Sequence, residues 1–477
     1  MNNNSLQRKA AKGVAWSAIE RFSVQGVNFL IQLILARLLL PSDYGLVGML
    51  SIFINLAQIF VDSGFANALI QKKNCTNKDY STVFLYNFVI ALVLYAILFF
   101  CAPAISNFYN EPKLINVTRV ISLTLVINAI SIIQRTKLIK SLDFKSQAKV
   151  SVSSATLSGV LGIVLAYKGF GVWSLCFQQI ANGVLQAIFY LVLVKWFPLL
   201  VFDKTSFKEL FNFGYKLVLV NLINAIYKNL YTIVIGKKFT PEKVGLYAKA
   251  EQFVVFPSGN LGSLIIRVIY PLLSEVQNDE GKLKSVYRNA IKLSSYIIFP
   301  LMFGLLAITK PFISVVLTDK WLSMAPIMQI LCLDWMLDHI SMINLNLLMV
   351  KGRTDLSLRL EIIKKIIAIS ILACSIPFGI IVMCWGRVLY SVIATYLNTR
   401  YTKLLIGLSL RNQLHDILPY FISSLIMALS VLFFNEFIAF SWAQLIVGII
   451  VGVLVYLFIS FCFFRDTLKK IISMKPW

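Results

Sequence analysis

Charged and amide side chains recur at helical spacing inside two apolar segments near the start of this sequence. Steps of three and four residues separate them, and such steps place side chains on one face of a helix. The residues are Arg21, Gln25 and Asn28 in the first segment and Asn55, Gln58 and Asp62 in the second. A face of this kind can bind a polar solute. The alternative is that its amides join neighbouring helices by hydrogen bonds.

Basic residues also lie within or at the ends of apolar segments. The four candidates are Arg21, Lys228, Lys249 and Arg267. A basic cluster suits an anionic solute, and arginine can grip phosphate through two parallel hydrogen bonds. The alternative for Arg21 and Arg267 is that each side chain extends to the nearby membrane surface. The pattern predicts that the four basic residues bind substrate together with Gln25, Asn28, Asn55 and Gln58.

Three aspartates inside apolar segments are candidates for coupling an ion to transport. Asp334 and Asp338 are four residues apart, so a continuous helix would place them one turn apart. Two carboxylates at that separation repel each other in a low-dielectric setting, which favours uptake of a proton or another cation. Asp62 is the third candidate, and its alternative role is to cap a helix or pair with a base.

The sequence lacks the short motifs that carry covalent chemistry or nucleotide hydrolysis. It contains no Walker motif, no HExxH and no GxSxG. Its seven cysteines are scattered and form no CxxC pair, so neither a zinc site nor a disulfide framework is indicated. We therefore expect no enzyme activity, no cofactor and no metal.

The composition indicates which elements must position these residues. Of the 477 residues 58% are apolar and only 14% are charged, and the mean hydropathy is +0.79. A soluble domain carries about 25% charged residues, so this chain has too few to coat a soluble surface. The apolar segments are long enough for helices that cross a bilayer. They lie near residues 14–37, 44–65, 81–103, 115–134, 150–167, 172–194, 215–235, 245–271, 290–309, 323–350, 360–382, 385–404, 417–436 and 443–464. The sequence predicts an all-α polytopic membrane protein with about fourteen helices.

The distribution of basic residues predicts the orientation of the chain. The net charge is +24, and the two tails and every second loop hold roughly four times as many Lys and Arg residues as the other loops. Arg387 is expected in one of those other loops. Basic loops face the cytoplasm, so both termini should be cytoplasmic. This explanation of the charge takes precedence over nucleic-acid binding, which we do not expect.

An internal repeat at an offset of 200 residues predicts the arrangement of the helices. Pro41 and Gly45 recur as Pro241 and Gly245, each pair between the first two segments of a six-segment block. The alternative is a chance match, because Pro-x-x-x-Gly is a common turn. Blocks with an even number of segments have the same orientation, so they would be two six-helix bundles related by a pseudo-two-fold axis along the membrane normal. The predicted parts are 1–214 and 215–405 for the bundles and 406–477 for two extra helices with the tail. Substrate would then cross between the bundles by alternating access.

Several stretches resemble the polysaccharide-transport (Wzx-type) flippases of the MOP superfamily. They are residues 12–49, VDSGFANALIQ (Val61–Gln71), GFGVWSL (Gly169–Leu175) and RVIYPLLSEVQND (Arg267–Asp279). The resemblance implies a MATE-like fold in the bacterial inner membrane. It also implies export of oligosaccharide repeat units carried on undecaprenyl diphosphate, for O-antigen, capsule or exopolysaccharide. Implied partners are membrane lipids, a polysaccharide polymerase and the chain-length machinery. The family has no strict site motif, so the basic residues above are inferred from this sequence alone.

Two other functions remain open. The nearer one is another MOP transporter, either a flippase for a lipid-linked peptidoglycan precursor or a multidrug exporter. An exporter of organic cations would favour an acidic binding site, against the basic residues of this chain. The other is a membrane-bound polysaccharide polymerase or ligase, which should carry a large outer loop. The loops predicted to lie outside are all short.

Overall fold

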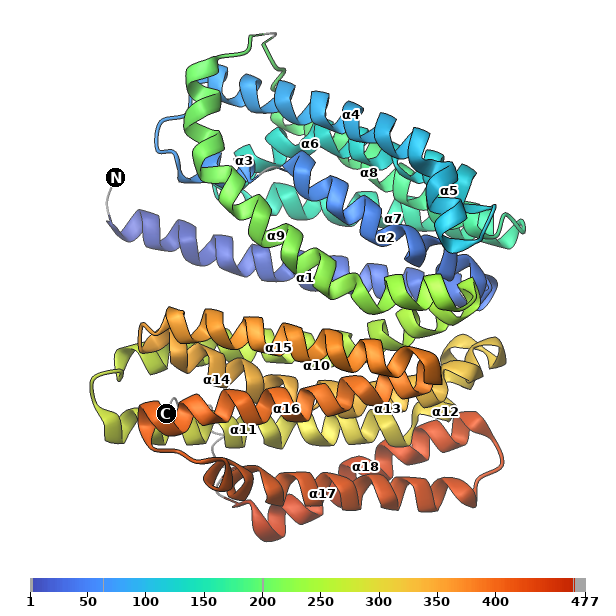
Figure 1. The fold of residues 1–477 in the computed structure, drawn as a ribbon, viewed down its shortest axis with the longest axis vertical. Helices are drawn as coiled ribbons and strands as arrows, with labels where there is room; N and C mark the ends of the chain where they lie inside the picture. Colours follow the sequence, from blue (N-terminus) through green and yellow to red (C-terminus); the bar gives the residue numbers. More distant parts are fainter. Residues whose placement is uncertain (1–2, 63, 200, 466, 468–477) are drawn as a thin grey trace. The chain divides into compact units, whose positions relative to one another are not determined.

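The computed structural model describes residues 3–62, 64–199, 201–465 and 467, and the regular elements of this part of the chain are helices (Figure 1). No strand occurs within the described residues. Each of the fourteen apolar segments corresponds to one helix or to a run of consecutive helical elements. The all-α fold predicted from the sequence is confirmed.

Contacts along the chain divide it into two compact units, Met1–Gly245 and Leu246–Trp477. The first unit contains α1 (Asn3–Leu38), α2 (Pro41–Asp62), α3 (Phe65–Gln71), α4 (Asn77–Tyr109), α5 (Leu114–Ile121), α6 (Leu123–Lys140), α7 (Phe144–Tyr167), α8 (Val172–Val194), α9 (Lys204–Lys238) and the first turn of α10 (Pro241–Glu275). Helix α9 is part of this unit because it packs against α2, α3 and α4. The division into parts 1–214, 215–405 and 406–477 follows the sequence repeat instead, and it stays a prediction.

The second unit holds the rest of α10 and the helices that follow. These are α11 (Glu280–Ala307), α12 (Thr309–Phe312), η1 (Ile313–Leu317), η2 (Asp319–Met324), α13 (Ala325–Trp335), α14 (Asp338–Val350), α15 (Thr354–Ser375), η3 (Ile376–Phe378), α16 (Ile380–Ile406), α17 (Leu410–Glu436) and α18 (Ser441–Phe463). The last two helices, α17 and α18, run side by side, and α17 packs along α11 (Figure 1).

Eleven helices within the described residues are long and apolar enough to cross a membrane. The other three predicted spans are not among these eleven helices. The stretch of α1 whose side chains are described is Phe22–Leu38, the span near 323–350 is interrupted between α13 and α14, and α15 carries several charges. With eleven such helices the chain is a multi-pass membrane protein.

The helix boundaries repeat at the offset found in the sequence. Helix α1 ends at Leu38 and α9 ends at Lys238, while α2 begins at Pro41 and α10 begins at Pro241. Proline suits the first turn of a helix because its missing N–H has no intrahelical partner there. The Pro-x-x-x-Gly motif therefore begins the second helix of each copy at the same point.

Polar N-caps begin several of the helices that follow the basic loops. Thr76 forms a capping box with Asp79 at the start of α4, and Asp143, Asp203 and Asp279 each accept a backbone N–H at the start of α7, α9 and α11. A cap of this type satisfies backbone donors that the first turn leaves open and contributes about 1 kcal/mol. These short polar residues thus determine where the chain turns back into the apolar layer.

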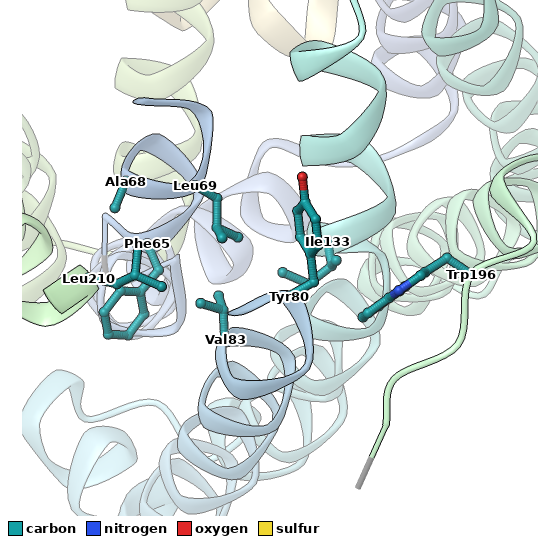
Figure 2. Close-up of a cluster of buried hydrophobic side chains, with 8 residues drawn as sticks. All are labelled: Phe65, Ala68, Leu69, Tyr80, Val83, Ile133, Trp196 and Leu210. Carbon is teal, nitrogen blue, oxygen red and sulfur yellow. The ribbon is translucent and has the colours of Figure 1, made fainter. Parts of the chain in front are cut away.

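A buried apolar cluster connects the short helix α3 to its neighbours in the first unit (Figure 2). Its members are Phe65, Ala68, Leu69, Tyr80, Val83, Ile133, Trp196 and Leu210. They come from α3, α4, α6, α9 and the segment after α8. The Phe65 ring also contacts the ring of Phe207 on α9 at 5.8 Å between centroids. The start of α9 is therefore held on α3 by packed apolar side chains.

An ion pair joins the same elements at their polar end. Lys72 follows α3, and its Nζ lies 2.8 Å from Glu209 Oε2 on α9 and 3.1 Å from Asp79 Oδ1 on α4. The hydrogen bond with Glu209, supported by Asp79, raises the pKa of Lys72. Lys72 therefore stays charged at neutral pH and joins α4 to α9.

Candidate functional site

Three polar residues of the first unit meet between α2 and α6. Asn128 Nδ2 of α6 donates to Gln58 Oε1 at 3.4 Å, and Gln58 Nε2 donates to Asp62 Oδ1 at 3.0 Å. Asp62 and Asn55 are exposed on α2, and Gln58 is half-buried. Asp62, Gln58 and Asn128 therefore form a hydrogen-bonded chain that starts at an exposed carboxylate on α2 and ends at a half-buried amide on α6.

The predicted polar residues of α1 are described in part. Arg21 lies in α1, but its side chain is outside what the structure describes. Gln25 is half-buried and Asn28 is exposed on the same helix. The structure therefore places an exposed amide on α1 one to two turns from the position of Arg21.

Helix α9 carries an exposed polar face. Asn221, Asn224 and Lys228 are all exposed along it, at steps of three and four residues. Ser51 Oγ of α2 lies 3.4 Å from Asn229 Oδ1 of α9, so polar groups also join the two helices. An amide or an ammonium group on a spanning helix is costly against lipid and must face water, a solute or protein.

The second unit contains a buried ionic cluster centred on Arg387 of α16. The guanidinium donates from Nε to Asp334 Oδ2 of α13 at 2.9 Å and from Nη1 to Glu251 Oε1 of α10 at 2.6 Å. Nη1 also donates to the hydroxyl of Tyr247, and the Ser391 hydroxyl donates to Asp334. One guanidinium thus connects three helices and holds two carboxylates.

Burial makes this cluster important for stability. The side chains of Arg387 and Asp334 are 14% and 8% exposed, and that of Glu251 is 29% exposed. Burial removes much of the water around each charge, so each charged group depends on its ion-pair partners for stabilisation. Removing one member of such a buried set costs about 3–5 kcal/mol, because the remaining charge is left unpaired.

The sequence pattern predicts a loop at Arg387, and this assignment was wrong. The residue is the eighth of α16 and faces α13 and α10. The signal that would have found it is a stripe of polar side chains at helical spacing along one segment. The stripe consists of Arg387, Ser391, Thr395, Asn398 and Thr402. It continues away from the cluster, because Thr395 contacts Ser341 of α14 and Thr402 donates to Asn344.

Asp334 and Asp338 have different partners, on the two sides of a short turn between α13 and α14. Helix α13 ends at Trp335 and α14 begins at Asp338, so the chain is interrupted between them. Asp334 is engaged with Arg387, whereas Asp338 is half-buried in the first turn of α14.

The remaining basic candidates, Lys249 and Arg267, lie on the same helix, α10, but differ in exposure. Lys249 is 3% exposed, and its Nζ lies 3.1 Å from Gln252 Oε1. Arg267 is exposed near the other end of α10. Of the two, Arg267 has its charge at the surface of the second unit, while Lys249 is enclosed by protein. Within the described residues, no group of three His, Cys, Asp or Glu side chains could hold a metal ion.

Comparison with known proteins assigns the chain to a family. A sequence profile described as polysaccharide biosynthesis protein matches residues 34–326, more than half of the chain. The chain belongs to this family. The teichuronic acid biosynthesis protein TuaB of Bacillus subtilis (strain 168) is 26% identical over 98% of both chains. The lipopolysaccharide biosynthesis protein WzxC of Escherichia coli (strain K12) is 26% identical over 88% of this chain and 86% of its own.

Solved structures show the same fold at low sequence identity. The lipid II flippase MurJ in an inward closed conformation has a TM-score of 0.75, with 16% identity over 95% of this chain and 99% of its own. An inward-facing multidrug resistance transporter of the MATE family, in the MOP superfamily, has a TM-score of 0.59 and 15% identity, over 82% of this chain and 99% of its own. The expected MATE-like architecture of this member of the polysaccharide biosynthesis family is confirmed.

Proposed function

We propose that this protein is a flippase for oligosaccharide repeat units linked to undecaprenyl diphosphate. It would move them across the bacterial inner membrane by alternating access, for O-antigen, capsule or exopolysaccharide. Family membership and the full-length similarity to TuaB and WzxC support a role in polysaccharide biosynthesis. The fold supports transport, since MurJ and the MATE transporter share it.

The observation that carries the proposal is the exposed polar face of α9. Asn221, Asn224 and Lys228 lie on a spanning helix, where hydrocarbon is an unfavourable surrounding for them. Amides hydrogen-bond sugar hydroxyls, and the ammonium group offsets the charge of a diphosphate that has left water. The lipid tail needs no such partner because it remains in the bilayer.

The other candidate substrate ligands divide in the same way, into groups that bind the diphosphate and groups that bind the glycan. The basic candidates Arg21 and Arg267 would attract the diphosphate, whereas Lys249 is enclosed by protein and would not contact it in this conformation. The amides Gln25, Asn28, Asn55 and Gln58 would bind the glycan. Asp62, Asp334 and Asp338 would couple an ion to transport, and Asp338 is better placed than Asp334 because Arg387 already holds Asp334.

The same proposal specifies where the substrate is made and which proteins use the product. Its substrate is made at the cytoplasmic face, and a polymerase with its chain-length machinery would use the product outside. We propose that the chain catalyses no covalent reaction. The lipid-linked peptidoglycan precursor remains the rival substrate, and deletion of the gene distinguishes the two.

Deleting the gene tests the function directly. We expect loss of surface glycan and accumulation of undecaprenyl-linked repeat units in the inner leaflet, because a diphosphate with a glycan does not cross lipid unaided. Both are measured by lipid extraction and glycan staining, with the wild-type gene restored on a plasmid as control. Normal surface glycan together with a block in peptidoglycan synthesis would support the rival substrate instead.

The orientation predicted from the basic loops has its own test. Reporter fusions should give a cytoplasmic signal when placed after Lys72, Lys140, Lys208, Lys284, Arg353 and Arg411. Loops rich in Lys and Arg stay on the cytoplasmic side of the membrane. Fusions at both termini should give the same result. A reporter at residue 208 or 284 that is active outside the cell would contradict the predicted topology.

A further inference from the structure

The segment that connects α8 to α9 exposes large apolar side chains, although it is a loop and not a spanning helix. Its described residues are 195–199 and 201–203, all within the first unit. Phe197 is 70% exposed, and three more side chains are between 45% and 49% exposed, namely Leu199, Val201 and Phe202. Apolar side chains grouped in this way are unfavourable in water and indicate a surface that binds a partner or a membrane.

Two hydrogen bonds hold the backbone of this segment on the start of α4. The N–H of Leu199 donates to Ser81 Oγ at 2.9 Å, and the N–H of Asp203 donates to Thr82 Oγ1 at 3.0 Å. Both acceptor side chains belong to residues that are fully buried. The segment is therefore fixed beside the first turns of α4 (Figure 1).

One aromatic side chain of the segment packs inward and leaves its neighbour outside. Trp196 is buried in the apolar cluster around α3, and its ring contacts the ring of Tyr80 at 6.2 Å between centroids (Figure 2). Lys137 Nζ lies 4.8 Å from the centroid of each of these two rings. The inward packing of Trp196 therefore fixes the segment from a second side, while Phe197 remains at the surface.

The hydrogen bonds to α4 also give the depth of the segment in the membrane. Ser81 and Thr82 are the fifth and sixth residues of α4, so they lie about 6–8 Å along the helix axis from its start. Residue 81 is also where the apolar segment predicted from the sequence begins. Non-helical backbone does not enter hydrocarbon, because its N–H and C=O groups need partners. The segment therefore lies at the boundary between headgroups and acyl chains, where interfacial apolar side chains insert.

Exposed lysines flank the apolar side chains at both ends. Lys195 precedes them, and Lys204 and Lys208 follow in the first turns of α9. The acids nearby are engaged with protein groups, Asp203 as the N-cap of α9 and Glu209 in an ion pair. Lysines beside inserted apolar side chains are attracted to the anionic headgroups of a membrane leaflet.

We propose that this segment is a docking surface for anionic phospholipid. The four exposed apolar side chains insert among the acyl chains, and the three flanking lysines bind the phosphate groups. The basic loops predict that the leaflet is the cytoplasmic one. The ring of Phe202 contacts the ring of Phe207 on α9 at 5.4 Å between centroids, so the bound lipid holds the start of α9 at a fixed depth. This surface does not depend on the flippase function proposed above.

Lipid selectivity of the purified full-length protein tests the three lysines. In detergent micelles, a fluorescent phosphatidylglycerol should bind the wild-type protein at least tenfold more tightly than the matching phosphatidylcholine. Each lysine near an anionic headgroup contributes roughly a fivefold gain in affinity. The variant that should lose this preference is Lys195→Gln, Lys204→Gln, Lys208→Gln.

A control variant removes the same charge elsewhere in the first unit. It replaces three exposed lysines that the charge rule assigns to the other side of the membrane, as Lys113→Gln, Lys238→Gln, Lys243→Gln. This control should keep the preference for phosphatidylglycerol. An equal loss in both variants, or no preference in the wild-type protein, would overturn the proposal.

A photocrosslink identifies what covers the apolar side chains. With p-benzoylphenylalanine replacing Phe197, irradiation of membranes should give a phospholipid adduct, detected by mass spectrometry of the full-length protein. The same replacement at Lys282, whose side chain is 74% exposed in a basic loop, should give none. An adduct with another protein at residue 197, or no lipid adduct there, would overturn the proposal. Neither measurement involves glycan export, so their failure would leave the proposed function standing.

Discussion

Replacing Arg387 with alanine should strongly destabilise the protein. Asp334 and Glu251 would lose their shared partner while they stay largely buried. The expected loss is about 3–5 kcal/mol of the free energy of unfolding, equivalent to a fall of about 10 °C in the apparent Tm. Thermal unfolding of the detergent-purified protein, together with its level in the membrane, measures this effect.

Two variants provide controls for the Arg387 prediction. Arg267→Ala removes an exposed arginine from the same unit and should change the apparent Tm little. Adding Asp334→Asn to Arg387→Ala removes one unpaired carboxylate and should recover part of the loss. An Arg387→Ala protein as stable as Arg267→Ala would show that the cluster does not hold the three helices together.

Matching asparagine variants separate a structural carboxylate from one that couples an ion. Asp334 is bound to Arg387, so Asp334→Asn should mainly lower protein level and stability. Asp338 begins the next helix, beyond the break, so Asp338→Asn should leave stability closer to wild type. If Asp338 couples an ion, this variant also slows export and shifts its dependence on pH or cation. An unchanged dependence at normal protein level would remove Asp338 from the coupling proposal.

Replacing Arg21 and Lys228 together with glutamine should strongly reduce glycan export at unchanged membrane expression. Each residue would contribute a charge-assisted contact to the diphosphate, and losing one such contact costs about 1.5–3 kcal/mol. That range corresponds to about a tenfold to a hundredfold loss for each residue. Surface glycan in a deletion strain, with membrane protein measured alongside, gives the result.

The charge-retaining exchanges Arg21→Lys and Lys228→Arg are the matched controls for this prediction. They keep a cation at each position and should be milder than the glutamine variants. Gln25 and Asn28 remain unchanged in both sets, so the amides on α1 cannot account for a difference. Full export by the Arg21→Gln, Lys228→Gln double variant would refute a basic substrate site and favour packing or membrane-surface roles for both residues.

The sequence determined the class of fold and the repeat. Long apolar segments dictate helices because a spanning chain must satisfy its own backbone hydrogen bonds, and this holds whatever the helices pack against. The offset between Pro41 and Pro241 likewise appears in both sequence and structure, because proline begins a helix by local geometry. Lys228 was among the basic candidates predicted from the sequence, and residue spacing alone places it on one helix face with Asn221 and Asn224.

Tertiary structure alone decided which polar residues are paired. Asp334 and Arg387 are far apart in the sequence, and only the packing of α13 against α16 makes their ion pair. The break before Asp338 was hidden because the apolar pattern continues through it, whereas the helix does not. The close approach of the first turns of α2 and α10, where a Cβ on Gly45 would lie 1.7 Å from the carbonyl oxygen of Pro241, could not be read from composition either. It depends on how closely two backbones approach, and residue spacing along one chain carries no information about that distance.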